Sequence, residues 1–480
     1  MTNRQVDVAI IGAGTAGLAA YRQARTHTDS VVLIEAGPHG TTCARVGCMP
    51  SKLLISAAEA VHQAEHAGRF GVNVDTVSVD GPAVMDRVRR ERDRFVGFVL
   101  ESVEEIPADH RIDGRARFID DGVVLVDDST RIEAGRVVIA TGSRTNIVPF
   151  LEAAGTRLIT SDDVFDWTDL PESVAVFGPG VIGLEIGQAL SRLGVRVRMF
   201  GVGGAVGPIQ DDEIRDIALS TFNEEFPLDP DAEVRSISET DEGVVLEFLD
   251  RDGNEQRETF EFLLAATGRR PNVDQLGLET TSLALDERGM PVFDRHTMQC
   301  GEQPVFIAGD ANNDIPLLHE AADQGRIAGA NAGQFPDVRT GLRRTPLSVV
   351  FTDPQIATAG LTIQQTDERC KGCFAIGSVS FENQGRARVM GRNRGLLRVY
   401  GEHGSGRFMG AEMFGPAAEH IGHLLAWAAQ SGLTVSAMLD MPFYHPVIEE
   451  GLRTALRDLN HQLRIGPEVP RNCIDCGPGG

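Results

Sequence analysis

Hydrophobic residues gather in short continuous runs along the chain, and these runs end in glycine or in a polar turn. Val6 to Ile11 form one run, interrupted only at Asp7, and residues 137–140, 174–177, 262–266 and 305–308 form others. Runs of this length predict strands that are buried on both faces, as in parallel sheets. A helical pattern follows several of these strands, so the chain is predicted to be an α/β protein.

The first run leads into a glycine-rich turn within the stretch VDVAIIGAGTAGLAA. The spacing of Gly12, Gly14 and Gly17 allows a tight turn, a close approach of the backbone to a pyrophosphate, and close packing of helix on strand. The next strand ends at Glu35, where an acid can bind a ribose hydroxyl. Together, these features predict a dinucleotide whose phosphates lie at the helix N-terminus.

A second glycine turn lies near the middle of the chain. Gly178, Gly180 and Gly183 repeat the spacing, but the next strand ends at Met199 and Phe200, without an acid. An acid at this position would select NAD, and an arginine would accept the additional phosphate of NADP. The sequence therefore predicts a second dinucleotide site in which the third glycine favours NAD, with NADP still open.

Two further strands end in a Thr-Gly turn, and a third ends in an acid. The first turn places Thr141, Gly142 and Ser143 after a buried strand, and the second places Gly268 in a similar position. Such turns are suited to returning the chain past a bound nucleotide. Asp310 follows the strand in VFIAGDANN, where an acid can bind a polyol chain, although a helix cap or turn is an alternative.

Composition and charge narrow the classes of partner. A chain of 480 residues is long enough for about two to four domains. Its net charge of -24 argues against nucleic acid or an anionic membrane as partner, because both would repel it. No run reaches the length of a membrane span, and no signal-peptide pattern precedes Val6, so a cytoplasmic location is expected.

Six of the seven cysteines fall into three close pairs. In the stretch TTCARVGCMPSK, Cys43 and Cys48 are five positions apart, and Lys52 follows them. Lys52 and Lys371 are the two lysines of the chain, and arginine provides the other positive charges. In a reducing compartment, paired cysteines are more often catalytic or metal-binding than structural.

The motifs occur in an order that resembles a known family. Between residues 6 and 457 the chain contains, in order, GAGTAG, TTCARVGCMPSK, ATGS, GPGVIGLE, ATGRRPN, GDANN and YHPVIEEGLRTAL. This set resembles the flavin-dependent pyridine nucleotide-disulfide oxidoreductases, and it is most similar to the dihydrolipoamide dehydrogenases. Some of the motifs are common alone, but their ordered combination is specific and covers nearly the whole chain.

The resemblance implies the fold class and the order of domains. It implies an α/β protein with two Rossmann-like dinucleotide-binding domains, for FAD and NAD(P), and a C-terminal α+β dimerisation domain. The expected segments are the first part of the FAD-binding domain, the NAD(P)-binding domain, a central segment that returns to the FAD-binding domain, the dimerisation domain and a flexible tail that contains cysteines. Their ranges are 1–150, 151–275, 276–345, 346–463 and 464–480.

The resemblance also implies roles around the first cysteine pair. Cys48 would be the thiol beside the flavin ring, and Cys43 the interchange thiol that faces the substrate. Lys52, about one helical turn beyond Cys48, would lie near the flavin and pair with Glu185. Thr42 would contribute to FAD binding. A purely structural disulfide is the alternative, and such disulfides are rare in the cytosol.

A base for the thiols is expected near the C-terminus. His445 lies in the stretch FYHPVIEE, with Glu450 five residues further on. In the family, this segment reaches into the active site of the partner subunit, where histidine accepts the thiol proton and glutamate holds the imidazole tautomer. The resemblance therefore implies a homodimer with composite active sites. Val447 stands where the family usually has threonine, which removes a hydroxyl from the segment.

Two departures from the family concern the substrate. The family usually has Gly-Gly-Thr before the first cysteine, whereas this chain has Gly40, Thr41 and Thr42, and Arg45 occupies a position that is often neutral. The predicted function is an FAD-dependent oxidoreductase that passes electrons between NAD(P)H, FAD, the redox-active Cys43–Cys48 disulfide and an external disulfide. Lipoamide and a protein disulfide are both candidates for that external disulfide.

Two further cysteine pairs leave several functions open. Cys473 and Cys476, near the end of the chain, could relay electrons to a bulky disulfide or a metal ion. Together with Cys370 and Cys373, they could instead bind zinc through four thiolates. The four cysteines could also be incidental. A further alternative is a non-catalytic redox sensor or scaffold that binds FAD.

Overall fold

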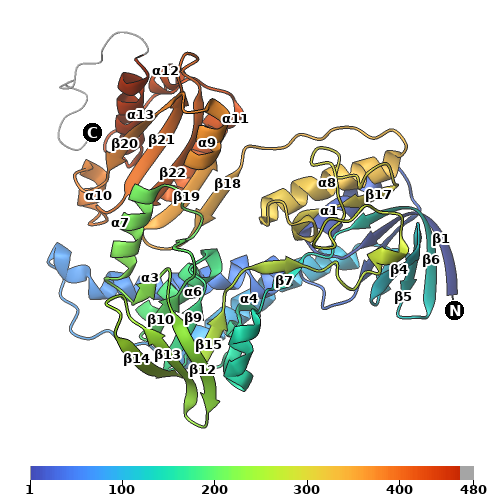
Figure 1. The fold of residues 1–480 in the computed structure, drawn as a ribbon, viewed down its shortest axis with the longest axis horizontal. Coiled ribbons are helices and arrows are strands. Elements are labelled where there is room, and N and C mark those ends of the chain that lie inside the picture. The colour runs from blue at the N-terminus through green and yellow to red at the C-terminus, as the bar shows by residue number, and fades with distance from the viewer. Residues whose placement is uncertain (1, 465–480) are drawn as a thin grey trace. The chain divides into compact units, whose positions relative to one another are not determined.

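The computed structural model describes residues 2–464, so Cys473 and Cys476 lie outside the described residues. The chain divides into two compact units, each built from three stretches of sequence (Figure 1). The first unit comprises Met1–Leu53, Asp86–Asn146 and Gly268–Arg343, and the second comprises Leu54–Met85, Ile147–Thr267 and the chain from Arg344 onward. Helices α3 (Cys48–Glu65) and α4 (Gly81–Glu104) each begin in one unit and end in the other.

A largely parallel sheet forms the centre of the first unit. Strands β3, β2, β1 and β6 lie in that order, β17 pairs with β6 in parallel, and β5 and β4 add an antiparallel extension. Val8, Ala9 and Ile10 of β1 are fully buried, as the hydrophobic run predicts. The strands are β1 (Thr2–Ile11), β2 (Val31–Glu35), β3 (Arg111–Asp113), β4 (Ala116–Asp120), β5 (Val123–Val126), β6 (Thr130–Ile139) and β17 (Val305–Ile307).

Two helices of the first unit pack against each other through small residues. Helices α1 (Thr15–Ala24) and α8 (Leu318–Gln334) lie side by side (Figure 1). A Cβ on Gly325 would lie 2.2 Å from the carbonyl oxygen of Ala16, and Gly329 approaches α1 equally closely one turn later. Because no side chain fits between these backbones, the small residues set the distance between the two helices.

The second unit contains a parallel sheet with a similar order. Strands β11, β10, β9, β15 and β8 lie side by side, and the first four repeat the arrangement of β3, β2, β1 and β6. Strands β12, β13 and β14 form a separate antiparallel sheet. The elements are β8 (Leu158–Thr160), β9 (Ser173–Phe177), α6 (Val181–Arg192), β10 (Arg196–Phe200), α7 (Asp212–Phe222), β11 (Leu228–Asp229), β12 (Val234–Thr240), β13 (Gly243–Leu249), β14 (Glu255–Phe260) and β15 (Phe262–Ala265).

An antiparallel sheet with flanking helices completes the second unit. Its strand order is β18-β19-β22-β21-β20, with α11 packed on β19 and β22 and α13 on β20 and β21. Every residue of β22 is buried, because helices cover this part of the sheet. The elements are β18 (Leu347–Val350), β19 (Gln355–Gly360), α9 (Ile363–Cys370), β20 (Phe374–Ser380), α10 (Gly385–Val389), β21 (Leu396–Glu402), β22 (Phe408–Gly415), α11 (Ala418–Gln430), α12 (Val435–Leu439) and α13 (Glu449–Leu463).

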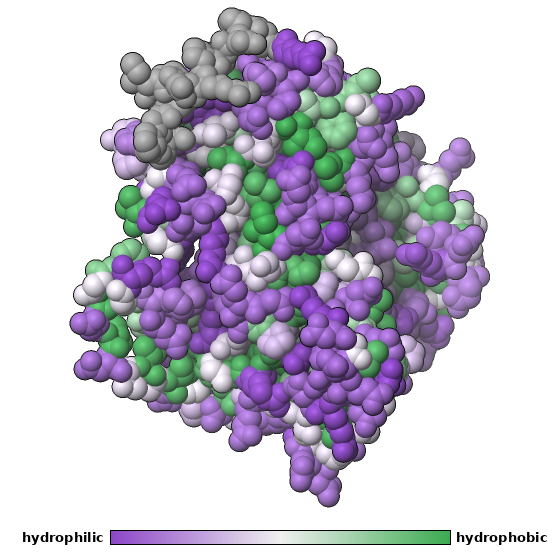
Figure 2. Space-filling model, turned by 60° about the vertical axis from the view of Figure 1, so that its left-hand side comes forward, coloured by the Kyte–Doolittle hydropathy of each residue, from purple (hydrophilic) through white to green (hydrophobic). Residues whose placement is uncertain are grey.

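Buried apolar side chains form hydrophobic cores on the faces of these sheets. None of the helices among residues 2–464 is both long and apolar enough to cross a membrane. Figure 2 shows hydrophilic residues over most of the face that it draws, with hydrophobic residues in small groups between them.

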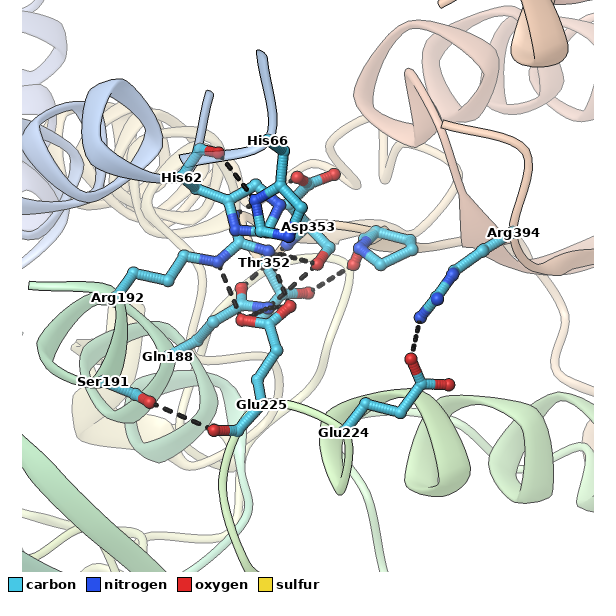
Figure 3. Close-up of polar contacts among 11 residues, drawn as sticks. His62, His66, Gln188, Ser191, Arg192, Glu224, Glu225, Thr352, Asp353 and Arg394 are labelled. Carbon is cyan, nitrogen blue, oxygen red and sulfur yellow. Dashed lines mark hydrogen bonds and ion pairs between the residues drawn. The ribbon is translucent and has the colours of Figure 1, made fainter. Parts of the chain in front are cut away.

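A buried ion-pair network joins α6 to the segment that precedes β19 within the second unit (Figure 3). The Arg192 side chain is 6% exposed, and its Nε and Nη2 lie 2.8 and 2.7 Å from the two carboxylate oxygens of Glu225. Arg192 Nη1 lies 3.2 Å from Oδ2 of Asp353. Gln188 donates to the Asp353 carbonyl oxygen at 2.9 Å. One guanidinium therefore neutralises two carboxylates that are largely removed from water.

A cavity of about 890 Å³ lies beside this network. His62 and His66 line it, with their ring centroids 4.1 Å apart (Figure 3). Burial, together with the charge of Arg192, lowers the pKa of His62 to about 4. His62 is therefore neutral at neutral pH and adds no second positive charge to the network.

Removal of Arg192 should destabilise the protein. The variant Arg192→Met leaves Glu225 and Asp353 buried without their shared cation, which should lower the free energy of unfolding by about 3 kcal/mol. Urea unfolding of the FAD-loaded protein measures this loss. The matched control is Arg394→Met, which breaks a pair with Glu224 whose side chains are 56% and 55% exposed. The control substitution should lower the free energy of unfolding by less than about 1 kcal/mol. Equal losses in both variants would contradict the stabilising role assigned to Arg192.

Candidate active site

The first glycine turn is fixed by contacts within the protein. Gly12 has a φ of +106°, and a Cβ at this position would lie 2.3 Å from the carbonyl oxygen of Ala140. A Cβ on Gly17 would lie 1.8 Å from the carbonyl oxygen of Gly12. Helix α1 therefore approaches the end of β1 so closely that glycine alone fits at these two positions.

Gly14 lies in a different environment, because a Cβ on it would have no heavy atom within 4 Å. It is the N-cap of α1, no side chain caps this helix end, and the first turn contains no acidic residue. The N–H groups at the start of α1 are therefore available to an anion. Contacts within the protein do not require glycine at this position, whereas a closely approaching pyrophosphate would.

Polar groups gather at the strand ends beside this turn. Glu35, at the end of β2, accepts a hydrogen bond from the Ala13 N–H at 2.6 Å. The hydroxyl of Thr141 is buried without a hydrogen-bond partner among the described residues. Ser143 donates to Oδ2 of Asp310 at 2.6 Å, which connects the chain after β6 to the chain after β17. The unpartnered hydroxyl and the open helix end together fit a bound FAD.

Arg269, for which the sequence predicts no role, holds the same turn. Its Nε donates to the Ser143 hydroxyl at 2.8 Å, and its Nη2 donates to the Ser143 carbonyl oxygen at 2.7 Å. The contact is made by pairing of β7 (Ser143–Thr145) with β16 (Arg269–Pro271). Gly268 directly precedes β16 in the first unit, whereas the other glycines predicted to bind NAD(P) lie in the second unit.

The second glycine turn repeats the geometry of the first. Gly178 has a φ of +106°, and its Cβ would lie 2.3 Å from the carbonyl oxygen of Ala266. A Cβ on Gly183 would lie 2.0 Å from the carbonyl oxygen of Gly178, and one on Gly180 would have no heavy atom within 4 Å. Gly180 is the N-cap of α6, again without a side-chain cap. The second unit therefore has its own open helix end, which fits the pyrophosphate of NAD(P).

The predicted thiol pair lies in the first unit, where two helices meet. Cys43 lies in α2 (Thr42–Val46), and Cys48 is the first residue of α3. A hydrogen bond between the two side chains, followed by burial, raises the pKa of the Cys43 thiol. The two sulfurs are therefore close enough to interact directly, as a pair that closes a disulfide must be. Lys52, in the next turn of α3, adds a cation close to the pair.

The turn before the thiol pair contains the residues that depart from Gly-Gly-Thr. Thr41 has a φ of +60°, which is unfavourable for a β-branched residue. Its side-chain oxygen accepts a hydrogen bond from the Ala44 N–H at 3.3 Å and so caps α2. Thr42 is exposed, and Arg45 Nη1 donates to the Pro38 carbonyl oxygen at 3.5 Å. The cap offsets part of the backbone strain beside Cys43.

Glu185 and Lys52 belong to different units. Glu185 lies in α6, is 4% exposed, and accepts a hydrogen bond from the Phe351 N–H at 3.0 Å. The pairing of Lys52 with Glu185 therefore stays a prediction.

His445 and Glu450 form a pair at the start of α13. Nδ1 of His445 lies 3.1 Å from each carboxylate oxygen of Glu450. The Glu450 side chain is 3% exposed and also accepts hydrogen bonds from Arg453 Nη2 at 3.3 Å and from the Val447 N–H at 3.2 Å. Because a carboxylate can only accept, Nδ1 carries a proton, and in the neutral imidazole the lone pair is then on Nε2. The His445 side chain is 72% exposed, so Nε2 is accessible from outside the chain.

Val447 takes part in this arrangement through its backbone. Gln384 Nε2 donates to the Val447 carbonyl oxygen at 2.8 Å, which fixes the segment between the histidine and the helix. Arg453 was not predicted from the sequence. Its position three residues after Glu450 in a helix is nevertheless the spacing at which two side chains form an ion pair.

The zinc hypothesis finds no support among residues 2–464. Cys370 and Cys373 close a tight turn after α9, in which the Cys373 N–H donates to the Cys370 carbonyl oxygen at 2.9 Å. Burial raises the pKa of the Cys370 thiol. No three His, Cys, Asp or Glu side chains gather as a metal site in this part of the chain.

A pair of neighbouring thiols in the same unit as an open nucleotide cradle is the arrangement expected of a nucleotide-dependent disulfide oxidoreductase. The chain belongs to the pyridine nucleotide-disulphide oxidoreductase family: residues 6–325 match the family model, and residues 347–456 match the dimerisation domain of that family. The predicted resemblance, fold class and enzyme class are therefore confirmed, and the family is FAD- and NAD(P)-dependent.

Curated relatives cover nearly the whole chain. Dihydrolipoyl dehydrogenase of Halobacterium salinarum is 30% identical, and the match covers 95% of this chain and 97% of that protein. Mercuric reductase of Streptomyces lividans is 32% identical, with 92% of this chain and 93% of the reductase covered. The similarity therefore extends to relatives with different named substrates.

Solved structures share the fold. LpdA from Mycobacterium tuberculosis matches with a TM-score of 0.79 at 25% identity, and the match covers 95% of this chain and 99% of LpdA. The HOCl-induced flavoprotein disulfide reductase RclA from Escherichia coli matches with a TM-score of 0.77 at 23% identity, and the match covers 96% of this chain and 100% of RclA. The likeness to RclA is one of fold alone.

Alanine substitutions should separate the glycines that the protein requires from the one that a ligand requires. Gly17→Ala forces a Cβ against the Gly12 carbonyl group and should destabilise the apoprotein by roughly 1–3 kcal/mol or more. Gly14→Ala should change the apoprotein by no more than about 0.5 kcal/mol, yet retain less FAD after purification. Thermal unfolding of the apoprotein and the flavin content of the purified protein measure the two effects. Full flavin retention in stable Gly14→Ala protein would contradict this assignment.

Proposed function

We propose that the protein passes electrons between a nicotinamide nucleotide and an external disulfide through bound FAD and the Cys43–Cys48 pair. The hydrogen-bonded thiol pair at the start of α3, in the same unit as the first dinucleotide cradle, is the observation that carries this proposal. FAD, when bound, supplies hydride acceptance from the nicotinamide and transfer of the electron pair to a disulfide. Gly14, Glu35, Thr141 and Asp310 would hold it.

The thiol chemistry begins at Cys43, the thiol that is predicted to face the substrate. The Cys43 thiol must lose its proton before it can attack an external disulfide. Attack forms a mixed disulfide with Cys43 and releases one substrate thiol. The Cys48 thiolate then attacks Cys43, which closes the internal disulfide and releases the second thiol. Two protein thiols are oxidised while one external disulfide is reduced, and the reverse sequence oxidises an external dithiol.

His445 is suited to accept the proton of Cys43. The hydrogen bonds from Nδ1 to Glu450 fix the tautomer and leave Nε2 as the base. Glu450 also stabilises the imidazolium that forms, while Arg453 balances its buried charge. The exposure of His445 supports a composite site, in which this imidazole serves the thiols of a second subunit in a homodimer. The dimerisation domain supplies the contact between the two subunits.

Lipoamide is the first candidate for the external disulfide, because relatives named dihydrolipoyl dehydrogenase match almost the full chain. Cys43 is partly exposed in the turn that Thr41 caps, which is compatible with attack on a small external disulfide. Dihydrolipoamide oxidation with NAD, followed at 340 nm, tests this substrate directly.

Mercuric ion is a second candidate substrate. The Streptomyces lividans relative named mercuric reductase is 32% identical, and the chain carries Cys473 and Cys476 near its end. Nicotinamide oxidation that depends on mercuric ion and is lost in Cys476→Ser would favour this function over disulfide turnover.

A composite active site makes a specific prediction about mixed dimers. Cys48→Ser alone should abolish disulfide turnover, and His445→Gln alone should reduce it by roughly a hundredfold or more. A heterodimer of the two variants has one site with both defects and one site with none. Random pairing should therefore restore roughly a quarter of wild-type turnover.

Differential affinity tags on the two variants would isolate the heterodimer for a direct assay. A matched control pairs Cys48→Ser with Cys43→Ser, because both defects then belong to the same thiol pair and no intact site can form. Absence of restored turnover in the Cys48→Ser and His445→Gln heterodimer would contradict the composite site.

A further inference from the structure

The second dinucleotide site differs from the first at the point where an adenosine ribose would bind. In the first unit, the N–H of the first fingerprint glycine donates to the Ile34 carbonyl oxygen at 2.7 Å, and Glu35 follows. In the second unit, the Gly178 N–H donates to the Phe200 carbonyl oxygen at 2.8 Å, and Gly201 follows. The backbone pairing therefore makes Gly201 the counterpart of Glu35.

An acidic side chain does not fit in place of Gly201. A Cβ there would lie 2.6 Å from the Pro230 carbonyl oxygen and 2.8 Å from Cγ of Pro179. Pro179 also has no N–H, whereas its counterpart Ala13 donates to Glu35 at 2.6 Å. The second turn has therefore lost both the donor and the acceptor of this hydrogen bond.

An acid that follows the neighbouring strand, β11, lies close to this position. β11 runs parallel to β10, and the Gly201 N–H donates to the Asp229 carbonyl oxygen at 2.7 Å. Two residues further on, Oδ1 of Asp231 accepts a hydrogen bond from the Gly203 N–H at 2.7 Å. The Asp231 carboxylate therefore contacts the loop that follows β10, whose first residue, Gly201, packs against Pro179 of the fingerprint.

This loop borders open space. Gly203 and Gly204 have φ values of +76° and +78°, and a Cβ on either would have no heavy atom within 4 Å. Asp231 is exposed. Of its two carboxylate oxygens, Oδ1 is the one that accepts a hydrogen bond from within residues 2–464. Oδ2 is thus available to a hydroxyl group at the edge of the second cradle.

The neighbouring arginines already make contacts within the protein. Arg196 and Arg198 of β10 lie 3.0 and 2.8 Å from the carboxylate of Glu258. Their guanidinium groups also lie over aromatic rings of the antiparallel sheet. Arg251 donates to the Leu228 carbonyl oxygen. Residues 201–207 and 229–232 contain no arginine or lysine, so neither segment offers a cation to a 2′-phosphate.

We propose that Asp231 is the residue that selects NAD over NADP. Its carboxylate would accept hydrogen bonds from the adenosine ribose and would repel the 2′-phosphate of NADP. In this role it replaces the strand-end acid that the contacts of Gly201 exclude. The proposal rests on the proposed function only in that the second cradle holds a pyridine nucleotide.

Binding of adenosine fragments to the FAD-loaded full chain tests this role without any turnover. The probes are 5′-AMP and 2′,5′-ADP, which differ in the 2′-phosphate alone, and calorimetric titration gives each Kd. Wild-type protein should bind 5′-AMP at least roughly tenfold more tightly, the range expected for hydrogen bonds to a charged group. Asp231→Asn should reduce this preference by roughly tenfold.

Two variants control for other charges. Asp241→Asn removes an exposed carboxylate from the β12–β13 hairpin of the same unit and should leave the preference unchanged. Arg251→Gln should also leave it unchanged, and a selective loss of 2′,5′-ADP binding in this variant would assign phosphate recognition to Arg251 instead. A wild-type preference for 2′,5′-ADP, or equal changes in Asp231→Asn and Asp241→Asn, would overturn the proposal. Failure of disulfide turnover would leave these binding results unaffected.

Discussion

Close backbone contact between a helix and the turn before it is the constraint on which both nucleotide sites depend. At Gly17 and Gly183, a Cβ would lie 1.8 and 2.0 Å from the carbonyl oxygen of the first fingerprint glycine. This contact fixes the start of α1 and of α6 over the end of a buried strand, so each helix directs its first N–H groups into open space. Backbone contacts within the protein exclude a side chain at Gly17 and Gly183. At Gly14 and Gly180 no protein atom does so, and a bound nucleotide would explain the glycine there.

The two units use the same turn but obtain their acid differently. In the first, Glu35 stands at the end of β2 and bonds to Ala13. In the second, Gly201 and Pro179 pack together and Asp231 comes from beyond β11. The turn is thus a fixed scaffold, and the two units differ in the residues beside it. Helix α3 likewise begins at Cys48 and so fixes the position of this thiol.

Local spacing accounts for what the sequence predicted well. The glycine fingerprints, the strand ends at Glu35 and Asp310, and the His445–Glu450 pair all depend on residues within one or two adjacent elements. Contacts between distant segments escaped prediction, as for Arg269 with Ser143 and for Asp231 with Gly203. These contacts depend on strand pairing, which a spacing pattern does not encode. The substrate could not be predicted either, because site shape rather than a motif selects the disulfide.

Anaerobic titration of the FAD-loaded protein with NADH tests the central claim, that flavin and the Cys43–Cys48 pair form one electron path. Uptake of about four electrons per subunit is expected, because flavin and disulfide each accept two. A long-wavelength thiolate-to-flavin band should also appear, and Cys48→Ser should abolish it. Uptake of about two electrons with no such band would mean that the thiol pair is not coupled to the flavin, and would contradict the account.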